Sequence, residues 1–101
     1  MEVVDVESKT EKIDKAVHML KAIAHPLRLQ IVELLTGNDE LCVSDIHRQI
    51  GVEQAVASQQ LKILKQNGVL NCERKGKHSF YHLAHPQIKD LISCIESCHS
   101  C

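Results

Sequence analysis

The chain of 101 residues carries 44% hydrophobic and 25% charged residues, which suits one globular domain and excludes a disordered tail, a collagen-like repeat or a coiled rod. One Tyr, one Phe and no Trp mean that the core is aliphatic, which favours small packed helices. No apolar run is long enough to span a membrane, and the charged N-terminus lacks the apolar core of a signal peptide. We therefore expect a cytoplasmic protein without membrane contact.

The net charge of −1 is unevenly distributed along the chain. Residues 54–83 carry five basic side chains against the single acid Glu73, whereas the remaining segments are acidic overall. A basic block in an acidic chain indicates an anionic partner that meets one face of the protein. A solvated basic face without a partner is the alternative that charge alone leaves open.

The first third of the chain predicts two helices. Residues 1–10 are polar, so we expect a flexible tail before a single domain that spans residues 11–101. Apolar residues at helical spacing predict a first helix from Glu11 to Ala24. His25-Pro26 then separates this helix from a second one over residues 27–35. We expect His25 to make a structural hydrogen bond at this junction.

The middle of the chain predicts two short helices and then two strands. Ser44 is a candidate N-cap for a helix that ends at Gly51, and the next helix covers residues 53–67. Two short helices joined by a glycine-containing turn are typical of a helix-turn-helix. Alternating residues then predict strands over 69–74 and 79–83, joined by a turn at Lys75-Gly76-Lys77. Cys72, in the first strand, is expected to be a small buried apolar residue.

A last helix follows His85-Pro86 and carries an apolar stripe. The stripe consists of Ile88, Leu91, Ile92 and Ile95. The predicted fold class is therefore mostly α with a small β-hairpin, in the order ααααββα. This order is that of a winged helix-turn-helix.

The helix over residues 53–67 has two different faces. The core stripe is Val56, Leu61 and Leu64, and the opposite stripe is Ala55, Ser58, Gln59 and Lys62. Glutamine and serine side chains pair with base edges, and lysine pairs with guanine or phosphate. The hairpin tip adds Arg74, Lys75 and Lys77, which would meet the phosphate backbone. The two basic elements, in this order, predict a DNA-binding protein.

Four segments together point to a known family: HPLRLQIVELL (25–35), ELCVSDI (40–46), QAVASQQLKILKQNGVL (54–70) and RKGKHSFYHL (74–83). They resemble the ArsR/SmtB family of bacterial metal-sensing repressors, and the resemblance covers about residues 12–101. It implies a homodimeric winged helix-turn-helix repressor that binds double-stranded operator DNA and is released by an inducer. It also implies that the first and last helices form the dimer interface, so we expect the stripe of the first helix to meet a partner subunit together with Ile88, Leu91, Ile92 and Ile95. The matched reading-helix positions are Gln54, Ser58, Gln59 and Lys62, and the wing is residues 75–78.

Members of this family place their inducer sites differently, and this sequence departs from two of the patterns. The site in the third helix uses a Cys-x-Cys, where this chain has Cys42-Val43-Ser44, so Cys42 is not expected to be a primary ligand. The site in the last helix matches His85 at its start and Cys98 and Cys101 at its end, but Gln87 replaces a ligand. The resemblance therefore implies this zinc-type site only in altered form.

Three of the five cysteines lie in the last eight residues. Cys94, Cys98 and Cys101 have i, i+4, i+7 spacing, so their thiols share one helical stripe. Three thiolates suit a thiophilic ion such as arsenite, cadmium or lead, and zinc would need a fourth ligand from His99, the partner subunit's His85 or water. A site within one chain, a site across a dimer and a cysteine-rich tail without a ligand all stay open.

A redox switch is the alternative function. Some proteins of this fold respond to oxidants or persulfides through a thiol pair, but the second-helix position of that pair is Glu33 here. Cys98-His99-Ser100-Cys101 also matches the CxxC motif of oxidoreductases. A helix and not a strand leads directly into this motif, and no parallel sheet is predicted, so we do not expect an enzyme. A constitutive DNA-binding protein is the third reading.

Overall fold

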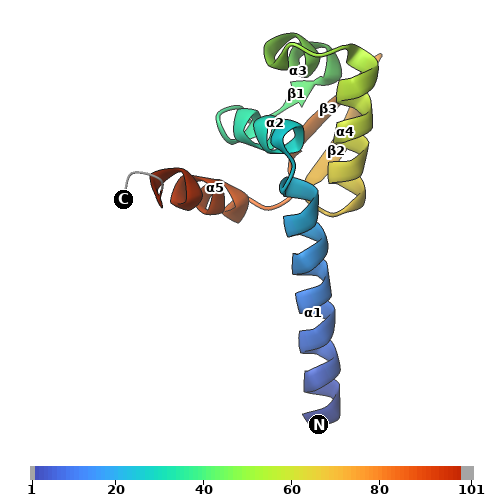
Figure 1. Ribbon diagram of the computed structural model, residues 1–101. Coiled ribbons are helices and arrows are strands. Elements are labelled where there is room, and N and C mark those ends of the chain that lie inside the picture. The colour runs from blue at the N-terminus through green and yellow to red at the C-terminus, as the bar shows by residue number, and fades with distance from the viewer. Residues whose placement is uncertain (1, 99–101) are drawn as a thin grey trace.

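The computed structural model describes the backbone of residues 2–98 and the side chains of residues 9–98. Its elements follow in the order α1 (Glu2–Ile23), α2 (Pro26–Thr36), β1 (Leu41–Cys42), α3 (Val43–Ile50), α4 (Gln54–Gln66), β2 (Leu70–Lys75), β3 (His78–Leu83) and α5 (Gln87–Cys98) (Figure 1). This order confirms the predicted winged helix-turn-helix. None of the described helices is long and apolar enough to cross a membrane.

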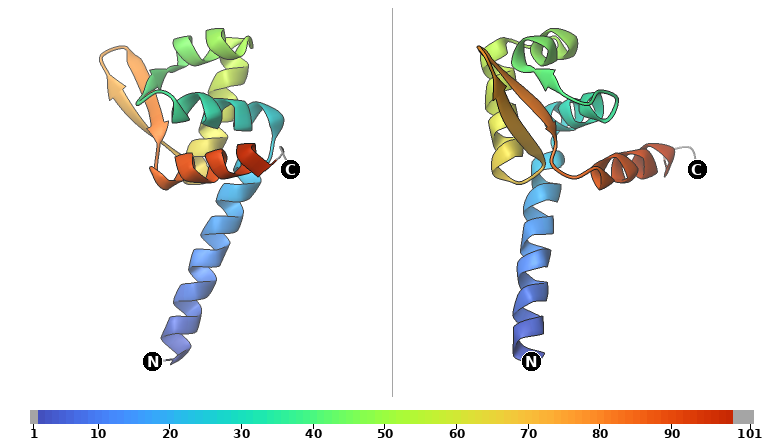
Figure 2. Two further views of the ribbon diagram at one scale, coloured as in Figure 1. Left: turned by 90° about the vertical axis from the view of Figure 1, so that its left-hand side faces the viewer. Right: turned by 180° about the vertical axis from the view of Figure 1, so that it is seen from behind.

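The helices α2, α3 and α4 form the body of the molecule together with the β2–β3 hairpin. Most of α1 extends from one end of this body as a straight rod, and α5 leaves it in another direction (Figure 1). The turn of the hairpin lies at the opposite end, the same end of the body as α3 and the start of α4 (Figure 2). The DNA-facing elements expected from the sequence therefore gather at one end, away from the free part of α1.

An aliphatic core joins the helices to the hairpin. Its most deeply buried large side chains are Ile31, Val32, Leu35, Ile46, Leu61, Leu64, Val69 and Leu70. Burying one such side chain stabilises a fold by about 1.5–3 kcal/mol, so aliphatic residues alone can supply a sufficient core. Val56, expected in the core stripe of α4, is only half-buried, and Ala57 takes the inner position instead.

The junction between α1 and α2 follows the prediction. His25 is the N-cap of α2, with extended backbone, and its Nδ1 accepts a hydrogen bond from the Leu27 amide at 3.2 Å. Pro26 occupies the first helical position, where its missing N–H costs nothing. The structural role expected for His25 is thus confirmed.

The helix α1 begins nine residues earlier than expected, at Glu2 instead of Glu11. Residues 2–10 contain no glycine or proline, so nothing in this segment interrupts the helical backbone. Apolar periodicity could not show this extension because the segment is polar. The flexibility of the predicted tail stays a prediction.

The sheet contains a third strand that the sequence did not predict. In the described residues the strand order is β1-β3-β2, with Leu41 opposite Tyr81 and Cys42 opposite Phe80. A strand of two residues is too short to show the alternation of apolar and polar side chains by which strands are predicted. Because β1 runs directly into α3, the N-cap of α3 is Cys42, and Ser44, the predicted cap, lies inside the first turn.

The helix α5 contributes to the core of the single chain. Ile88 and Ile92 are buried, whereas Leu91 and Ile95 are exposed. The apolar stripe predicted for the dimer interface is thus divided between two surfaces. The prediction that Ile88 and Ile92 contact a partner subunit is wrong, because these two side chains already pack against the core of their own chain.

Candidate DNA-binding interface and cysteine helix

The helix α4 presents the polar stripe expected from the sequence. Ala57, Leu61 and Leu64 face the core and hold the helix in place. The stripe on the other side consists of Ala55, Ser58, Gln59 and Lys62, all exposed, and Gln54 is exposed at the first helical position. Hydrogen-bonding side chains therefore project from a helix whose opposite face is fixed.

The turn between α3 and α4 sets the angle of that helix. Gly51 has a φ of +82°, the left-handed conformation that favours glycine, and its amide donates to the His47 carbonyl at 2.9 Å. The Nδ1 of His47 lies 3.1 Å from the Val52 carbonyl oxygen and bonds to it. The two contacts close the end of α3, so α4 starts in a defined direction.

The wing cations differ from one another in their contacts. Lys75 Nζ forms an ion pair with Glu40 Oε1 at 2.7 Å and lies 5.4 Å from the ring centre of Phe80. The hydrogen bond to Glu40 raises the pKa of Lys75, which stays protonated. Arg74 Nε donates to the Gly76 carbonyl at 3.4 Å, across the turn. From the sequence, Lys75 was expected to meet phosphate like Arg74 and Lys77. In the structure its ion pair with Glu40 instead connects the wing to the segment before β1.

A shallow pocket brings the wing and the helix-turn-helix together. It has a volume of about 180 Å³ and is lined by Cys42, Val43, Ser44, Gln54, Lys77, His78 and Ser79. Gln54 from the start of α4 and Lys77 from the hairpin turn, both predicted from the sequence, thus border one hollow. Among residues 9–98, no acidic side chain lines this hollow, as suits a surface that approaches a polyanion.

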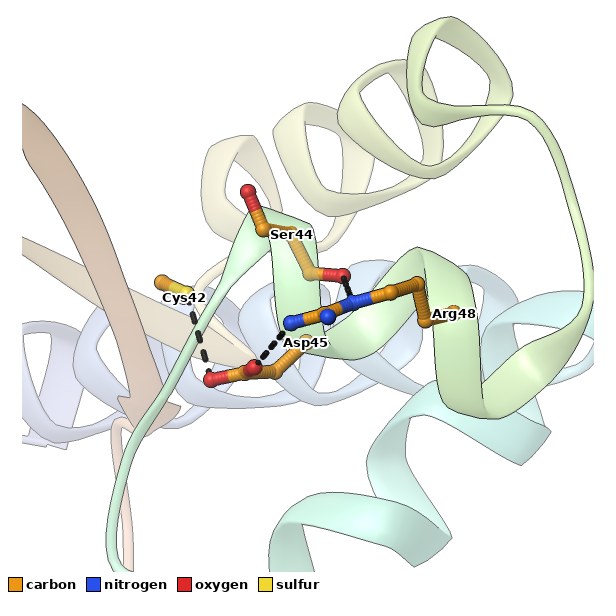
Figure 3. Close-up of polar contacts among 4 residues, drawn as sticks. All are labelled: Cys42, Ser44, Asp45 and Arg48. Carbon is orange, nitrogen blue, oxygen red and sulfur yellow. Dashed lines mark hydrogen bonds and ion pairs between the residues drawn. The ribbon is translucent and has the colours of Figure 1, made fainter.

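The segment around Cys42 forms a closed cluster of polar contacts (Figure 3). The buried thiol of Cys42 donates to Asp45 Oδ2 at 3.2 Å, and Arg48 forms an ion pair with Asp45 Oδ1 at 2.8 Å. Arg48 Nε also donates to the Ser44 carbonyl at 3.0 Å. The thiol and the carboxylate that could serve as ligands here are therefore engaged with each other and with a cation.

The cysteines of α5 have a different environment. Cys94 and Cys98 are exposed and one helical turn apart, while Cys101 lies outside the described residues. Among residues 9–98, no three His, Cys, Asp or Glu side chains are grouped closely enough to hold a metal ion. Exposed His85 lines a separate pocket of about 430 Å³ with Lys15 and His18 of α1. The described part of the chain therefore supplies two of the three predicted thiols.

The remaining cysteine, Cys72, lies in the sheet. It is half-buried opposite Tyr81 in the β2–β3 register. Burial, followed by the interaction with the Cys72 thiol, raises the pKa of Tyr81 above its ordinary value. The burial expected from the sequence is therefore only partial, and the thiol has a polar neighbour in Tyr81.

Comparison with known proteins identifies the family. The profile described as "Bacterial regulatory protein, arsR family" matches residues 25–71. An uncharacterised HTH-type transcriptional regulator of Methanocaldococcus jannaschii is 33% identical over 86 residues, which cover 85% of this chain and 97% of that protein. The chain belongs to the ArsR family. ArsR-family proteins are DNA-binding transcriptional regulators and not enzymes.

Two further relatives of this ArsR-family chain extend the likeness. The biofilm growth-associated repressor of Xylella fastidiosa is 30% identical over 89 residues, covering 88% of this chain and 77% of that protein. The solution structure of a homodimeric winged helix-turn-helix DNA-binding domain from Mycobacterium bovis superposes with a TM-score of 0.82 at 28% identity. That match covers 91% of this chain and 84% of the other. Fold and family agree with the resemblance noted from the sequence.

Two carboxyl groups of this ArsR-family chain meet between α2 and α5. A hydrogen bond that protonated Glu33 donates to the Glu96 carboxylate, the negative charge of Glu96 and slight burial raise the pKa of Glu33. The raised pKa means that the folded state gains stability while Glu33 is protonated and loses it as the pH rises through that pKa. We expect Glu33→Gln to raise the free energy of unfolding at pH 7, by less than about 1 kcal/mol because water screens exposed charges.

Urea unfolding at fixed protein concentration checks this effect. The gain from Glu33→Gln should shrink below pH 4.5, where the wild-type carboxyl is protonated in both states. Glu11→Gln, at an exposed position on α1, is the control and should show no such pH dependence. A gain of the same size at both pH values would contradict the repulsion between Glu33 and Glu96.

Proposed function

We propose that this chain is a homodimeric, cytoplasmic transcriptional repressor that leaves its operator when a thiophilic metal or metalloid binds the C-terminal cysteines. The observation that carries the DNA-binding part is the exposed stripe of α4 beside the basic wing, at one end of the body. The sensing part rests on the chemistry of the α5 cysteines. A flexible N-terminal tail before a domain over residues 11–101 belongs to the same proposal.

Base reading is assigned to α4. A glutamine side chain can pair with the N6 and N7 edge of adenine, which suits Gln59 and Gln54. Ser58 can bond several base edges, and Lys62 can reach guanine or phosphate. These side chains are exposed, so no packed group has to move before they meet a major groove.

Phosphate contact is assigned to the wing, with Arg74, Lys75 and Lys77 in unequal roles. Lys77 lies in the turn beside the pocket that also holds Gln54. Lys75 would have to exchange its Glu40 contact for a phosphate, so its net contribution to DNA binding should be smaller than that of Lys77. The Glu40 carboxylate thus competes with DNA for the Lys75 ammonium group.

Substitutions on the two elements should have different effects on DNA binding. Lys77→Ala should weaken binding to operator and random DNA alike and reduce the salt slope by about one. Gln59→Ala should cost about 1–3 kcal/mol on operator only. Glu40→Gln should strengthen binding to all DNA, because it frees Lys75 for phosphate. Fluorescence anisotropy titrations at several salt concentrations measure all three effects.

Lys89→Ala is the matched control, because Lys89 is an exposed lysine on α5 outside the reading elements. It should leave affinity and salt slope unchanged. If Gln59→Ala weakens operator and random DNA equally, Gln59 is not a base-reading residue. If Lys77→Ala changes nothing, the wing does not contact DNA.

The dimer is supported by apolar side chains that the single chain leaves exposed. They are Ile13, Val17 and Leu20 on α1 and Leu91 and Ile95 on α5. Exposed apolar residues repeated along one side of a helix mark an interaction surface, and the similar Mycobacterium bovis domain is homodimeric. A dimer also supplies the two reading helices that a two-fold operator requires.

The α5 cysteines fit a soft ion better than a hard one. Cys94 and Cys98 present two exposed sulfur atoms one turn apart, and Cys101 continues the same spacing in the sequence. Thiolate sulfur selects thiophilic ions, so arsenite, cadmium and lead are the expected inducers, with zinc if a nitrogen or water ligand is added. Cys42 is assigned no ligand role, because its thiol bonds to Asp45.

The alternative is the same repressor switched by oxidation or persulfidation of its cysteines. The exposure of Cys94 and Cys98 is the observation that favours it, since oxidants reach exposed thiols first. At the α2 position where the family resemblance places the partner thiol of a redox switch, this chain has Glu33, which contacts Glu96 of α5. A redox switch here would therefore use a cysteine pair within the C-terminal segment.

A further inference from the structure

Arg28 joins three helices through one half-buried side chain. It lies in the first turn of α2, and its Nε donates to the carbonyl oxygen of Ala22 at 2.6 Å. One of its terminal nitrogens donates to Gln60 Oε1 at 3.0 Å. Ala22 belongs to the last turn of α1, and Gln60 lies in the middle of α4. The guanidinium group therefore connects the end of α1 with the reading helix.

The contact is suited to fixing an angle. The Ala22 carbonyl is one of the last four of α1, which have no amide partner within their own helix and lie at the negative end of its dipole. Hydrogen bonds from a charged donor are shorter and stronger than neutral ones. The guanidinium plane holds its donors in a rigid fork, so both acceptors are held in one geometry, which a flexible lysine cannot reproduce.

The two connected helices have different tasks in the proposed dimer. The exposed residues Ile13, Val17 and Leu20 of α1 face the partner, whereas Gln59, the neighbour of Gln60, faces the DNA. Ile13 lies nine residues from Ala22, about 13.5 Å along the helix, so a tilt of about 15° at the fixed end moves Ile13 by about 3.4 Å, one base-pair step. A change of this size in the angle between α1 and α4 therefore changes the distance between the half-sites that the dimer fits.

We infer that Arg28 is a positioning residue that fixes α4 relative to α1 and thereby sets the half-site spacing that the dimer accepts. The inference rests on the proposed DNA-binding dimer. It assigns no contact between Arg28 and DNA. Loss of the residue should therefore relax the spacing preference of the protein, and not its preference for particular bases.

The test compares one DNA site at three spacings. A duplex enriched from random sequence by the full wild-type protein is used as it is, and with one base pair inserted or removed between its half-sites. We expect wild type to bind the selected duplex about tenfold more tightly than either duplex with altered spacing. A loss of this size is similar to the effect of one mismatched base pair. Arg28→Lys should reduce that preference to about twofold or less, while sedimentation still shows a dimer and affinity for random DNA is kept.

Two more variants make the result decisive. Gln60→Met removes only the bond to α4, so it should relax the spacing preference even if Arg28→Lys fails to fold. Arg48→Lys is the matched control, because within residues 9–98 the hydrogen bonds of Arg48 go to Ser44 and Asp45 of its own helix α3, and it should keep the wild-type preference. An unchanged preference in Gln60→Met and Arg28→Lys would overturn the inference, as would an equal loss of affinity for all three duplexes. A wild-type protein that selects no duplex would instead overturn the proposed function.

Discussion

Leu20→Asp and Ile95→Asp should each convert the protein into a folded monomer that no longer holds its operator. Both side chains are more than half exposed in the single chain, at 52% and 54%, so a carboxylate there does not disturb the core. It would, however, be buried without a partner in a dimer interface, which is strongly unfavourable. Because a monomer covers one half-site only, affinity should fall from the specific range to the non-specific one, by about a thousandfold or more.

Sedimentation and DNA titration together measure this effect, and two variants of α5 serve as controls. Ser93→Asp places the same charge at an exposed position off the apolar stripe and should leave the dimer intact. Ile92→Asp should unfold the chain, because Ile92 is 3% exposed and packs in the core. If Leu20→Asp and Ile95→Asp both stay dimeric with full operator affinity, the interface lies elsewhere.

Serine at any one of the three C-terminal cysteines should abolish the response to the inducer and leave operator binding unchanged. Cys94→Ser, Cys98→Ser and Cys101→Ser each keep the size of the side chain but replace a soft thiolate with a far weaker ligand for thiophilic ions. A site that loses one of its three thiolates can no longer complete the pyramidal three-sulfur coordination of arsenite, or three-sulfur binding of cadmium or lead. The helix α5 extends away from the body that holds α4 (Figure 1), so DNA affinity without inducer should stay at the wild-type value.

Cys42→Ser and Cys72→Ser are the matched controls for this prediction. Cys42 is buried and bonded to Asp45, and Cys72 lies half-buried in the sheet, so neither is placed to bind an inducer. Both variants should therefore bind operator and respond to inducer nearly as wild type does. If Cys42→Ser alone loses the response, the inducer site lies at the start of α3 and the assignment to α5 is wrong.

A site on α5 can influence DNA binding because this helix belongs to two surfaces. Ile88 and Ile92 pack into the core, and Leu91 and Ile95 face outwards towards the proposed partner. An ion that holds the end of α5 in one position would favour one arrangement of the two subunits. The coupling between inducer and operator is then the difference in affinity of the inducer for the two arrangements.

The helix-turn-helix and the wing could be predicted from sequence because their signals are local. Gly51 and Gly68 end α3 and α4 with positive φ, and the apolar spacing of α4 identified its exposed face. The strand β1 could not be predicted, since two residues carry no period. The division of α5 between core and exposed surface could not be predicted either. An apolar stripe shows that a helix face is covered, but not whether the same chain or a partner subunit covers it.

Two contacts that position elements of the candidate site join residues that are far apart in the sequence. Lys75 meets Glu40 across 35 residues, and Arg28 meets Gln60 across 32. Charge counting grouped the three wing cations as phosphate contacts, and it could not show that Lys75 pairs with Glu40 in the folded chain. No spacing rule links such pairs within one sequence, so these contacts became visible only with the fold.

Release of operator DNA under anaerobic conditions tests the central claim most directly. Labelled operator bound to the reduced full-length protein is titrated with arsenite, cadmium, lead, zinc and a persulfide in turn, with anisotropy as the readout. The account predicts release by one or more of the thiophilic ions at close to one ion per site, and no release by that ion from the Cys98→Ser protein. Release by persulfide with none by any ion would contradict metal sensing and establish the redox switch. Retention of operator under all five additions would contradict sensing by these cysteines altogether.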